Sequence, residues 1–328
     1  MTSSRFDLLQ QWAQQIMDRP DLSLMLISGD ASFRKYYRAA GRIWVDAPPS
    51  TEKNREFIDN AALLKKAALA APEVFTVDFE NGFLSLSDLG DISLLSQLTP
   101  DNVGIWYNQA LGLLPSIAKI SHESFPKFDD EFMARENSIF PEWLLQHHLK
   151  LELSETETAL LADTFQLLSE NNLSQPQVTM HRDFHSRNLM VLKSGELAVI
   201  DFQDMVVGPL TYDAVSLLKD CYCRWPDEVI EAGLLHSYFL YQKAGLLAKG
   251  VSLEQFWKWF DLTGMQRHLK AAGIFTRLNH RDGKTGYMKD IPRTLGYVVD
   301  VAEKYEEFQT FSTWLKEKVL PHFSEVHP

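Results

Sequence analysis

The sequence predicts an α+β protein of two lobes, a small β-rich lobe followed by a larger helical one. The first 90 residues alternate short apolar runs with turn signals, a pattern typical of strands. From residue 91 onward, apolar residues recur at helical spacing, interrupted by one β-type stretch over residues 178–202. We therefore expect an N-terminal lobe over residues 1–90 and a C-terminal lobe over residues 91–328.

The N-terminal lobe should open with a helix over residues 4–18, whose apolar residues share one face. Ser50 or Thr51 is expected to cap a second helix that runs to about residue 70. Asn81-Gly82 is a strong signal for a two-residue hairpin turn. Strands are expected over residues 22–27, 33–38, 42–47, 74–80 and 83–88.

The C-terminal lobe should consist mainly of long helices. They are expected over residues 101–119, 130–150, 154–170, 210–222, 227–247, 252–271 and 300–320. Within the single β stretch, two apolar runs at 189–192 and 197–200 flank a polar turn that contains Gly195. These runs predict a short hairpin.

Composition and charge limit the classes of function. Of the 328 residues, 45% are hydrophobic and 23% are charged, which is ordinary for a globular protein. The 44 acidic residues exceed the 32 lysines and arginines, for a net charge of −12, which argues against a nucleic-acid partner. No apolar stretch reaches the roughly 18 residues of a membrane span. We therefore expect a cytoplasmic protein with neither a nucleic-acid nor a membrane partner.

The hairpin predicts a site for chemistry. It should bring Asn188, before its first strand, beside Asp201, after its second, with Asp183 on the preceding loop. Oxygen-bearing side chains gathered in this way suit a hard cation that keeps waters, such as Mg²⁺. In phosphoryl transfer a metal neutralises phosphate charge while a carboxylate orients the attacking hydroxyl. Asp183 would be that catalytic base, Asn188 and Asp201 would hold the metal, and His181 would support the loop.

The alternative to a catalytic site is an ordinary surface loop followed by an acidic turn, and any one of these residues alone would favour that alternative. The combination is more specific: H-R-D-x-x-x-x-N, an apolar hairpin, then Asp-Phe. That combination is typical of a kinase catalytic site.

These segments resemble the aminoglycoside phosphotransferase superfamily, whose fold is similar to that of eukaryotic protein kinases. The matching segments are residues 29–38, 180–189, 200–204, 208–213, 266–270 and 273–278, and the resemblance spans nearly the whole chain. Within the superfamily they are most similar to bacterial kinases that phosphorylate N-acetylmuramate and N-acetylglucosamine at the anomeric C1 hydroxyl. The resemblance implies a protein-kinase-like fold, with nucleotide binding in the lobe over residues 1–90 and with the catalytic loop and the acceptor site in the lobe over residues 91–328. It also implies ATP and Mg²⁺ as cofactors, a nucleotide and a small sugar as substrates, and Asp213 as a structural acid that braces the catalytic loop.

On the nucleotide side, residues 28–38 stand where the superfamily has a loop that covers the phosphates. Gly29 is the only glycine there, and Ser32, Arg34 and Lys35 are the candidate contacts. The segment 84–90, with Leu86 and Asp88, would line the adenine slot. An ordinary hairpin and the last strand of a sheet are the structural alternatives for these two segments.

The sequence departs from the superfamily at the next strand, which usually carries a lysine paired with a glutamate on the following helix. Residues 42–47 contain no lysine, and Asp46 stands near the expected position. Arg34 or Lys35 could supply the missing charge, or Asp46 could hold a cation against the nucleotide. Glu52 and Glu56 are the candidate acids, although exposed helical acids are more often solvated.

The acceptor side has a local positive balance. Seven lysines and arginines between residues 267 and 293 face only two acids. Arg267, Lys270 and Arg277 could form an anion-attracting wall for a carboxylate-bearing sugar, or the run could be a solvated helix face.

Two further functions remain open at this point. One is an aminoglycoside, choline or homoserine kinase on the same fold, since fold alone does not determine the acceptor. The other is a pseudokinase that binds nucleotide without turnover, for which the missing strand lysine is the main argument.

Overall fold

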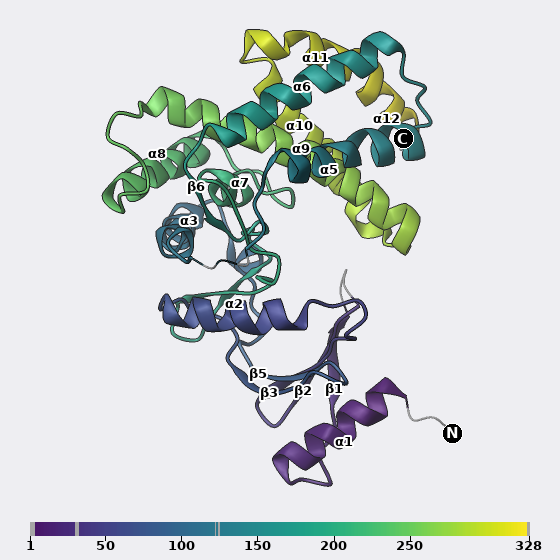
Figure 1. The fold of residues 1–328 in the computed structure, drawn as a ribbon, viewed down its shortest axis with the longest axis vertical. Helices are drawn as coiled ribbons and strands as arrows, with labels where there is room; N and C mark the ends of the chain where they lie inside the picture. Colours follow the sequence, from purple (N-terminus) through teal and green to yellow (C-terminus); the bar gives the residue numbers. More distant parts are fainter. Residues whose placement is uncertain (1–3, 30–32, 122, 124, 327–328) are drawn as a thin grey trace. The chain divides into compact units, whose positions relative to one another are not determined.

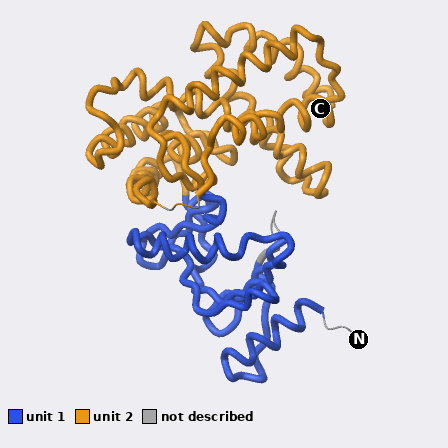
Figure 2. The backbone as a smooth tube through the Cα atoms, in the orientation of Figure 1, with its two compact units in different colours: residues 1–97, 186–205 blue, residues 98–185, 206–328 orange. Residues whose placement is uncertain are grey.

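The computed structural model describes residues 4–29, 33–121, 123 and 125–326, and it divides into two compact units (Figure 2). The first unit comprises residues 1–97 and 186–205, and the second comprises residues 98–185 and 206–328. The units are not contiguous in sequence, because residues 186–205 group with the β-rich N-terminal part. The predicted fold class is confirmed: a small antiparallel sheet in the first unit and a mainly helical second unit.

The first unit is built on a five-stranded antiparallel sheet in the order β1-β2-β3-β5-β4 (Figure 1). Each expected strand is present, although the first begins at Met25 rather than Leu22. The strands are β1 (Met25–Gly29), β2 (Lys35–Ala39), β3 (Arg42–Asp46), β4 (Val74–Asp78) and β5 (Phe83–Ser87).

Helix α1 (Arg5–Met17) packs its apolar face on residues of this sheet. The Ser4 hydroxyl accepts a hydrogen bond from the Asp7 backbone, and the Asp7 carboxylate accepts one from the Ser4 backbone, which is a capping box. Leu9 and Ala13 are fully buried in a cluster that includes Trp44 of β3. Phe6 and Ile16, which share this helical spacing, are exposed, so only the middle of the predicted apolar face is buried.

Helix α2 (Asn54–Lys66) begins later than predicted. Ser50 or Thr51 as its cap is wrong, because the N-cap residue is Lys53, which makes no side-chain cap. The Thr51 backbone instead donates to the Pro48 carbonyl and closes a turn. The Asn54 side chain donates to the Ala47 carbonyl at 2.8 Å, which ties the start of the helix to the end of β3.

The hairpin turn between β4 and β5 requires its glycine. Gly82 has a φ of +71°, in the left-handed region that other residues adopt only with strain. An added Cβ would also lie 2.0 Å from the Ala47 carbonyl oxygen. The Asn81-Gly82 signal is thus confirmed.

The second unit is mainly helical. Its α-helices are α3 (Val103–Leu111), α4 (Leu114–Ala118), α5 (Asp130–Ile139), α6 (Glu155–Leu173), α7 (Tyr212–Leu218), α8 (Asp227–Lys243), α9 (Leu253–Asp282), α10 (Ile291–Ala302), α11 (Gln309–Trp314) and α12 (Leu320–Val326). Short 3₁₀ or π-helical segments are η1 (Leu94–Gln97) in the first unit, and η2 (Phe140–His148), η3 (Thr285–Asp290), η4 (Glu306–Phe308) and η5 (Leu315–Val319) in the second.

Three helical predictions need correction. The helix expected over residues 101–119 is interrupted after Leu111, and α9 continues to Asp282, eleven residues past its expected end. A continuous helix over 300–320 is wrong, because α10 ends at Ala302 and α11 begins at Gln309. Helix α9 ends at Gly283, a left-handed glycine of the kind that commonly terminates a helix.

One strand was missed. In the second unit β6 (Gln177–Met180) pairs antiparallel with β9 (Val206–Pro209). The sequence did not predict β9, because Gly208-Pro209 is a typical turn signal and only two apolar residues, Val206 and Val207, precede it in the strand. Gly208 packs on Met180, whose side chain leaves no space for a Cβ. The remaining strands, β7 (Leu189–Val191) and β8 (Leu197–Val199), belong to the first unit.

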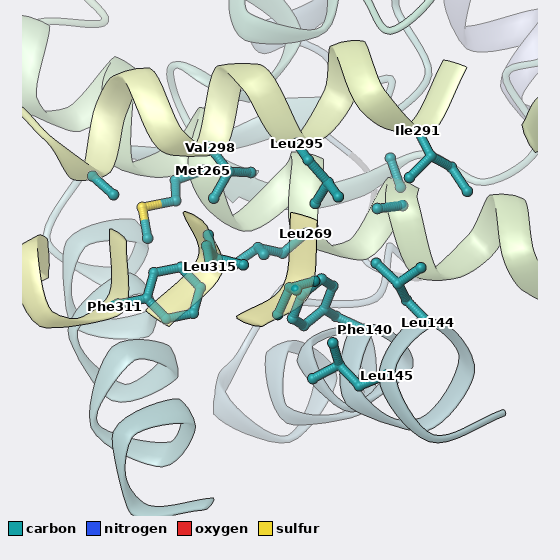
Figure 3. Packing of buried hydrophobic residues seen from close by; sticks show 14 of the residues in the cluster. Phe140, Leu144, Leu145, Met265, Leu269, Ile291, Leu295, Val298, Phe311 and Leu315 are labelled. Atoms are coloured by element: carbon teal, nitrogen blue, oxygen red, sulfur yellow. The ribbon is translucent and has the colours of Figure 1, made fainter. Parts of the chain in front are cut away.

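The main core of the second unit forms around α9. Met265 and Leu269 of α9 contact Leu295 and Val298 of α10, and side chains from η2 and α11 complete the cluster (Figure 3). Gly273 allows α9 to approach the end of α5, since a Cβ there would lie 2.5 Å from the Ile139 carbonyl oxygen. Among the residues described, no helix is both long and apolar enough to cross a membrane.

Candidate active site

The hairpin of β7 and β8 has the predicted geometry. Leu189 pairs with Val199 and Val191 with Leu197, and the turn between the strands contains Gly195 at a φ of +84°. The Ile200 backbone donates to the Asn188 carbonyl at 3.0 Å. This register brings the residues that flank the two strands to one end of the hairpin.

Asn188 and Asp201 meet at that end. The Asn188 amide donates to Asp201 Oδ2 at 3.3 Å, and Gln203 donates to Asp201 Oδ1 at 2.7 Å. Asp201 is solvent-exposed and has a φ of +65°, a left-handed conformation that aspartate tolerates better than most residues. The carboxylate and the amide oxygen form a hard, all-oxygen donor set with open access, and this set fits Mg²⁺ completed by waters and substrate phosphates.

Helix α2 holds the segment that follows Asp201. The rings of Phe57 and Phe202 stack with centroids 4.8 Å apart, and the Asn60 amide donates to the Phe202 carbonyl at 2.8 Å. Lys53 forms an ion pair with Asp204 at 2.6 Å. The backbone around Asp201 is therefore fixed to the helix that packs beside it.

Arg34 and Glu52 form a buried ion pair in the first unit. Arg34 is 2% exposed, and its Nε lies 3.0 Å from Glu52 Oε2. The guanidinium also lies over the Phe57 ring, 5.1 Å from its centroid. The expectation that Glu52 is solvated is therefore wrong, whereas Glu56 is exposed as expected.

The environment of Tyr36 places this ion pair near the metal-ligand candidates. Burial raises the pKa of the Tyr36 hydroxyl, the charge of Arg34 lowers it, and the charge of Asp201 raises it. Both charged groups therefore act on the same phenol. The tertiary structure brings a buried arginine and the exposed carboxylate to one region.

Asp46 has a different partner from the one considered in the sequence. Arg5 Nε donates to Asp46 Oδ1 at 2.8 Å, and the Asp46 side chain is buried. Its carboxylate is thus occupied by the α1 guanidinium, which corrects the alternative in which Asp46 holds a cation against the nucleotide.

The other nucleotide-side candidates lie on the sheet. Gly29 ends β1 opposite Lys35, the first residue of β2. Leu86 is buried in β5, and the backbone N–H of the next residue, Ser87, already donates to the Glu73 carbonyl at 2.9 Å. Ser32 lies outside the described residues.

Asp88 is engaged in an ion pair. Its Oδ2 accepts from Arg38 Nε at 2.7 Å, and Arg38 also binds Asp91 at 2.7 Å. The Gly90 backbone donates to Asp88 Oδ1 at 2.9 Å. In this structure Asp88 holds the segment after β5 against β2.

In the second unit, Asp213 binds the backbone of the loop that precedes Asp183. Its Oδ2 accepts from the His181 N–H at 2.6 Å, and its Oδ1 accepts from the Arg182 N–H at 2.9 Å. His181 is fully buried, and Arg182 has a φ of +75°. The two hydrogen bonds from Asp213 support this strained backbone immediately before Asp183.

Asp183 is half-buried among positive charges. Burial alone would raise the pKa of its carboxyl, but the surrounding cations outweigh this effect and lower it to about 2. In decreasing order these cations are Lys270, Arg182, His185 and Arg267. The carboxylate is thus ionised at any pH near neutrality.

Two of these cations share an acid that sequence reasoning missed. Glu136 of α5 is 5% exposed; it accepts from Arg182 Nη2 at 2.6 Å and lies 3.7 Å from Lys270 Nζ. Glu136 lies on a predicted helix, where an acid is normally solvated. Its ion-pair partners are 46 and 134 positions away in the sequence, and no local signal indicates them.

The predicted basic wall is divided by the structure. Arg267 and Lys270 are buried, and the positive charges of both lower the pKa of Asp183. Arg267 also donates to Cys221 Sγ at 3.5 Å. Arg277 lies two helical turns farther along α9 and lines a separate cavity with Arg182.

Comparison with known proteins identifies related sequences. Residues 23–247 match a family described as "Phosphotransferase enzyme family". The chain is 40% identical to an N-acetylmuramate/N-acetylglucosamine kinase of Pseudomonas aeruginosa, over 85% of this chain and 83% of that protein. It is 35% identical to a protein of the same name from Neisseria meningitidis serogroup B, over 95% of each chain.

A solved structure shows the same fold at low sequence identity. A choline/ethanolamine kinase family protein of Mesorhizobium loti superposes with a TM-score of 0.64 and 13% identity, over 98% of this chain and 99% of that one. At this identity the similarity extends to the fold alone.

Proposed function

Because the chain belongs to the phosphotransferase enzyme family, we propose that it transfers the γ-phosphoryl group of ATP to the anomeric C1 hydroxyl of N-acetylmuramate or N-acetylglucosamine. The names of the two relatives that are 40% and 35% identical support this choice of acceptor. The observation that carries the proposed chemistry is the Asn188–Asp201 pair, which follows Asp183 on the same loop and hairpin.

In this proposal Asp183 is the catalytic base. Its ionised carboxylate accepts the proton of the C1 hydroxyl while the C1 oxygen forms a bond to the γ-phosphorus. The bond from that phosphorus to the bridging oxygen of ADP breaks at the same time, and the electron pair leaves with ADP. A carboxylate with a pKa of about 2 is a weak base, which suits an anomeric hydroxyl because it is more acidic than an ordinary alcohol.

Asn188 and Asp201 would hold Mg²⁺, which when bound supplies charge neutralisation for the triphosphate. The protein's own contribution is to fix the two ligands. The hairpin register sets the position of Asn188, and the α2 contacts to Phe202 and Asp204 set that of Asp201. A ligand pair that is ordered before the nucleotide binds avoids that ordering cost in the complex.

Arg34 and Glu52 are the proposed substitute for the missing lysine–glutamate pair. A buried guanidinium held by a carboxylate is always charged and can bind phosphate oxygens through more than one N–H. The shared influence of Arg34 and Asp201 on Tyr36 supports a position near the phosphates. Gly29, Ser32 and Lys35 remain candidates for the covering loop, and Leu86 and Asp88 for the adenine side.

Acceptor screening tests the proposal. Purified protein with ATP and Mg²⁺ is assayed for ADP release with N-acetylmuramate, N-acetylglucosamine, kanamycin, choline and homoserine, and the product is examined by ³¹P NMR for a C1 phosphate. We expect turnover with the two amino sugars only. Turnover of another acceptor alone, or ATP binding without any turnover, would contradict the proposal.

A further inference from the structure

The second unit contains an open cavity of about 530 Å³ where the end of α9 passes α5 and η2. We call it the arginine cavity, because two aromatic rings and four arginines line it: Phe132, Trp143, Arg135, Arg182, Arg277 and Arg281. Two glutamates, Glu136 and Glu142, also line it, so the arginines outnumber the acids. A cavity with this lining favours an anionic ligand that also has an apolar face.

Arg277 differs from the other three arginines. Arg135 pairs with Glu131 at 2.6 Å, Arg182 with Glu136 at 2.6 Å, and Arg281 with Asp282 at 2.8 Å. Within the described part of the chain, Arg277 forms no ion pair, and its Nε is buried without a hydrogen-bond acceptor. Burial lowers the pKa of its guanidinium, and the charge of Arg281 lowers it further. The charges of Asp282, Glu142 and Glu136 raise it, but the net effect is a lowered pKa.

This environment is unfavourable for a guanidinium that has no ligand. A buried donor without an acceptor costs free energy, and burial together with the neighbouring charges disfavours the charged form of Arg277. Arg281 lies four residues beyond Arg277, on the same face of α9. A carboxylate bound beside Arg277 would supply the missing acceptor and an opposite charge.

Arg182 and Glu136, which line the arginine cavity, also connect it to the surroundings of Asp183, because Glu136 lies 3.7 Å from Lys270 Nζ. Arg182 lines the cavity and immediately precedes the proposed base. Lys270 makes the largest favourable charge contribution at Asp183, and Arg277 follows it on α9 by seven residues, or about 10 Å along the helix axis. An acceptor sugar whose reacting hydroxyl meets Asp183 would thus extend a substituent toward Arg277.

We propose, resting on the proposed function, that the arginine cavity is the subsite for a carboxylate carried by the acceptor sugar, with Arg277 as its direct partner. N-acetylmuramate carries such a group on its lactyl ether, away from the anomeric carbon, whereas N-acetylglucosamine has a hydroxyl there. Phe132 and Trp143 provide aromatic surface for the apolar face of the ring. Arg277 therefore determines specificity between the two sugars and takes no part in the chemical step.

The test compares the two sugars on the Arg277→Gln variant. For N-acetylmuramate we expect kcat/KM to fall about 10- to 100-fold, the usual effect of losing one charge-assisted interaction. For N-acetylglucosamine we expect a change of less than about twofold, because that sugar presents no carboxylate. Arg277→Lys should restore part of the loss, since it keeps the charge without the planar geometry. Arg19→Gln is the control for net charge, because Arg19 is exposed and lies in the first unit.

A substrate variant makes the test independent of protein folding. The methyl ester of N-acetylmuramate lacks the charge, so the unaltered protein should discriminate against it as strongly as Arg277→Gln discriminates against the acid. The variant itself should treat acid and ester alike, which closes a double-mutant cycle. Calorimetric titration of the ATP-free protein with the acid and the ester provides a readout without turnover.

Three results would overturn the inference: an equal loss for both sugars, no loss for N-acetylmuramate, or equal binding of acid and ester by the unaltered protein. Failure of the proposed function is distinguishable, because the unaltered protein would then phosphorylate neither sugar.

Discussion

Replacement of Asp183 by asparagine preserves the size of the side chain and removes the charge that four surrounding cations stabilise. Without the carboxylate the acceptor hydroxyl loses its proton acceptor, and we expect kcat to fall by about 10²- to 10⁴-fold, the range for general-base catalysis. A value near 10² is expected, because a base with a pKa of about 2 accepts a proton weakly. The KM for ATP should change less than about twofold.

The same substitution has a calculable effect on stability. The fold lowers the pKa of Asp183 from 3.8 to about 2, so the carboxylate gains at most about 2 kcal/mol from its surroundings. Asparagine forfeits that gain and leaves Lys270 and Arg267 less compensated. For a unit of roughly 200 residues we expect Tm to fall by about 4–8 °C.

A coupled ADP-release assay measures kcat, isothermal calorimetry measures ATP affinity, and thermal unfolding followed by circular dichroism measures Tm. Asp163→Asn is the matched control, because Asp163 is exposed on α6 and should leave all three quantities unchanged. A fall in kcat of less than tenfold, a parallel loss of ATP affinity, or an unchanged Tm would refute the reasoning.

Three further predictions follow from the structure. Arg34→Met should raise the KM for ATP about 10- to 100-fold. It should also destabilise the protein by about 3–5 kcal/mol, because it leaves the Glu52 carboxylate buried without its ion-pair partner. Adding Glu52→Leu should restore stability in urea unfolding but not ATP affinity, and recovery of both would show that Arg34 is only structural. Asp201→Asn should lower kcat about 100-fold and raise the Mg²⁺ concentration needed for half-maximal rate. A magnesium titration identical to that of the unaltered protein would count against a ligand role for Asp201. Burial, and then the charge of Arg267, lower the pKa of His268 from 6.5 to about 3. Below pH 6.5 the unfolded state therefore binds a proton that the folded state does not, and His268 should lower the free energy of unfolding by about 1.4 kcal/mol for each pH unit of acidification. His268→Gln should remove this pH dependence between urea titrations at pH 6 and pH 5, and an unaltered pH dependence would contradict the assignment.

The positions of Asn188 and Asp201 could be predicted because the interactions that set them are local. Two apolar runs around a glycine-containing turn can pair in only a few registers, and the register determines which flanking residues meet. The Asn81-Gly82 turn was predictable for the same reason. The boundary errors at residues 50–54 and 300–309 arose where turn geometry and tertiary packing outweigh helical periodicity.

The surroundings of these residues could not be predicted. The Glu52 acid was considered, but its burial against Arg34 was not expected, because an acid near the start of a helix is usually solvated. Glu136 was missed entirely, because its partners Arg182 and Lys270 come from distant segments. The basic run over residues 267–293 correctly indicated a concentration of cations. It did not indicate that α9 would carry Arg267 and Lys270 to Asp183, and Arg277 and Arg281 to the arginine cavity.

The sequence by itself determined the fold class, the hairpin and the order of the catalytic-loop residues, since these depend on periodicity, turn chemistry and contacts within about twenty residues. The tertiary structure alone decided which charges surround Asp183, which acid holds Arg34, and which of the four arginines in the arginine cavity forms no ion pair with the described residues. Those features depend on burial and on pairs of charges brought together from distant segments, and the free energy of a charge is set by its surroundings in space rather than by its neighbours in the chain.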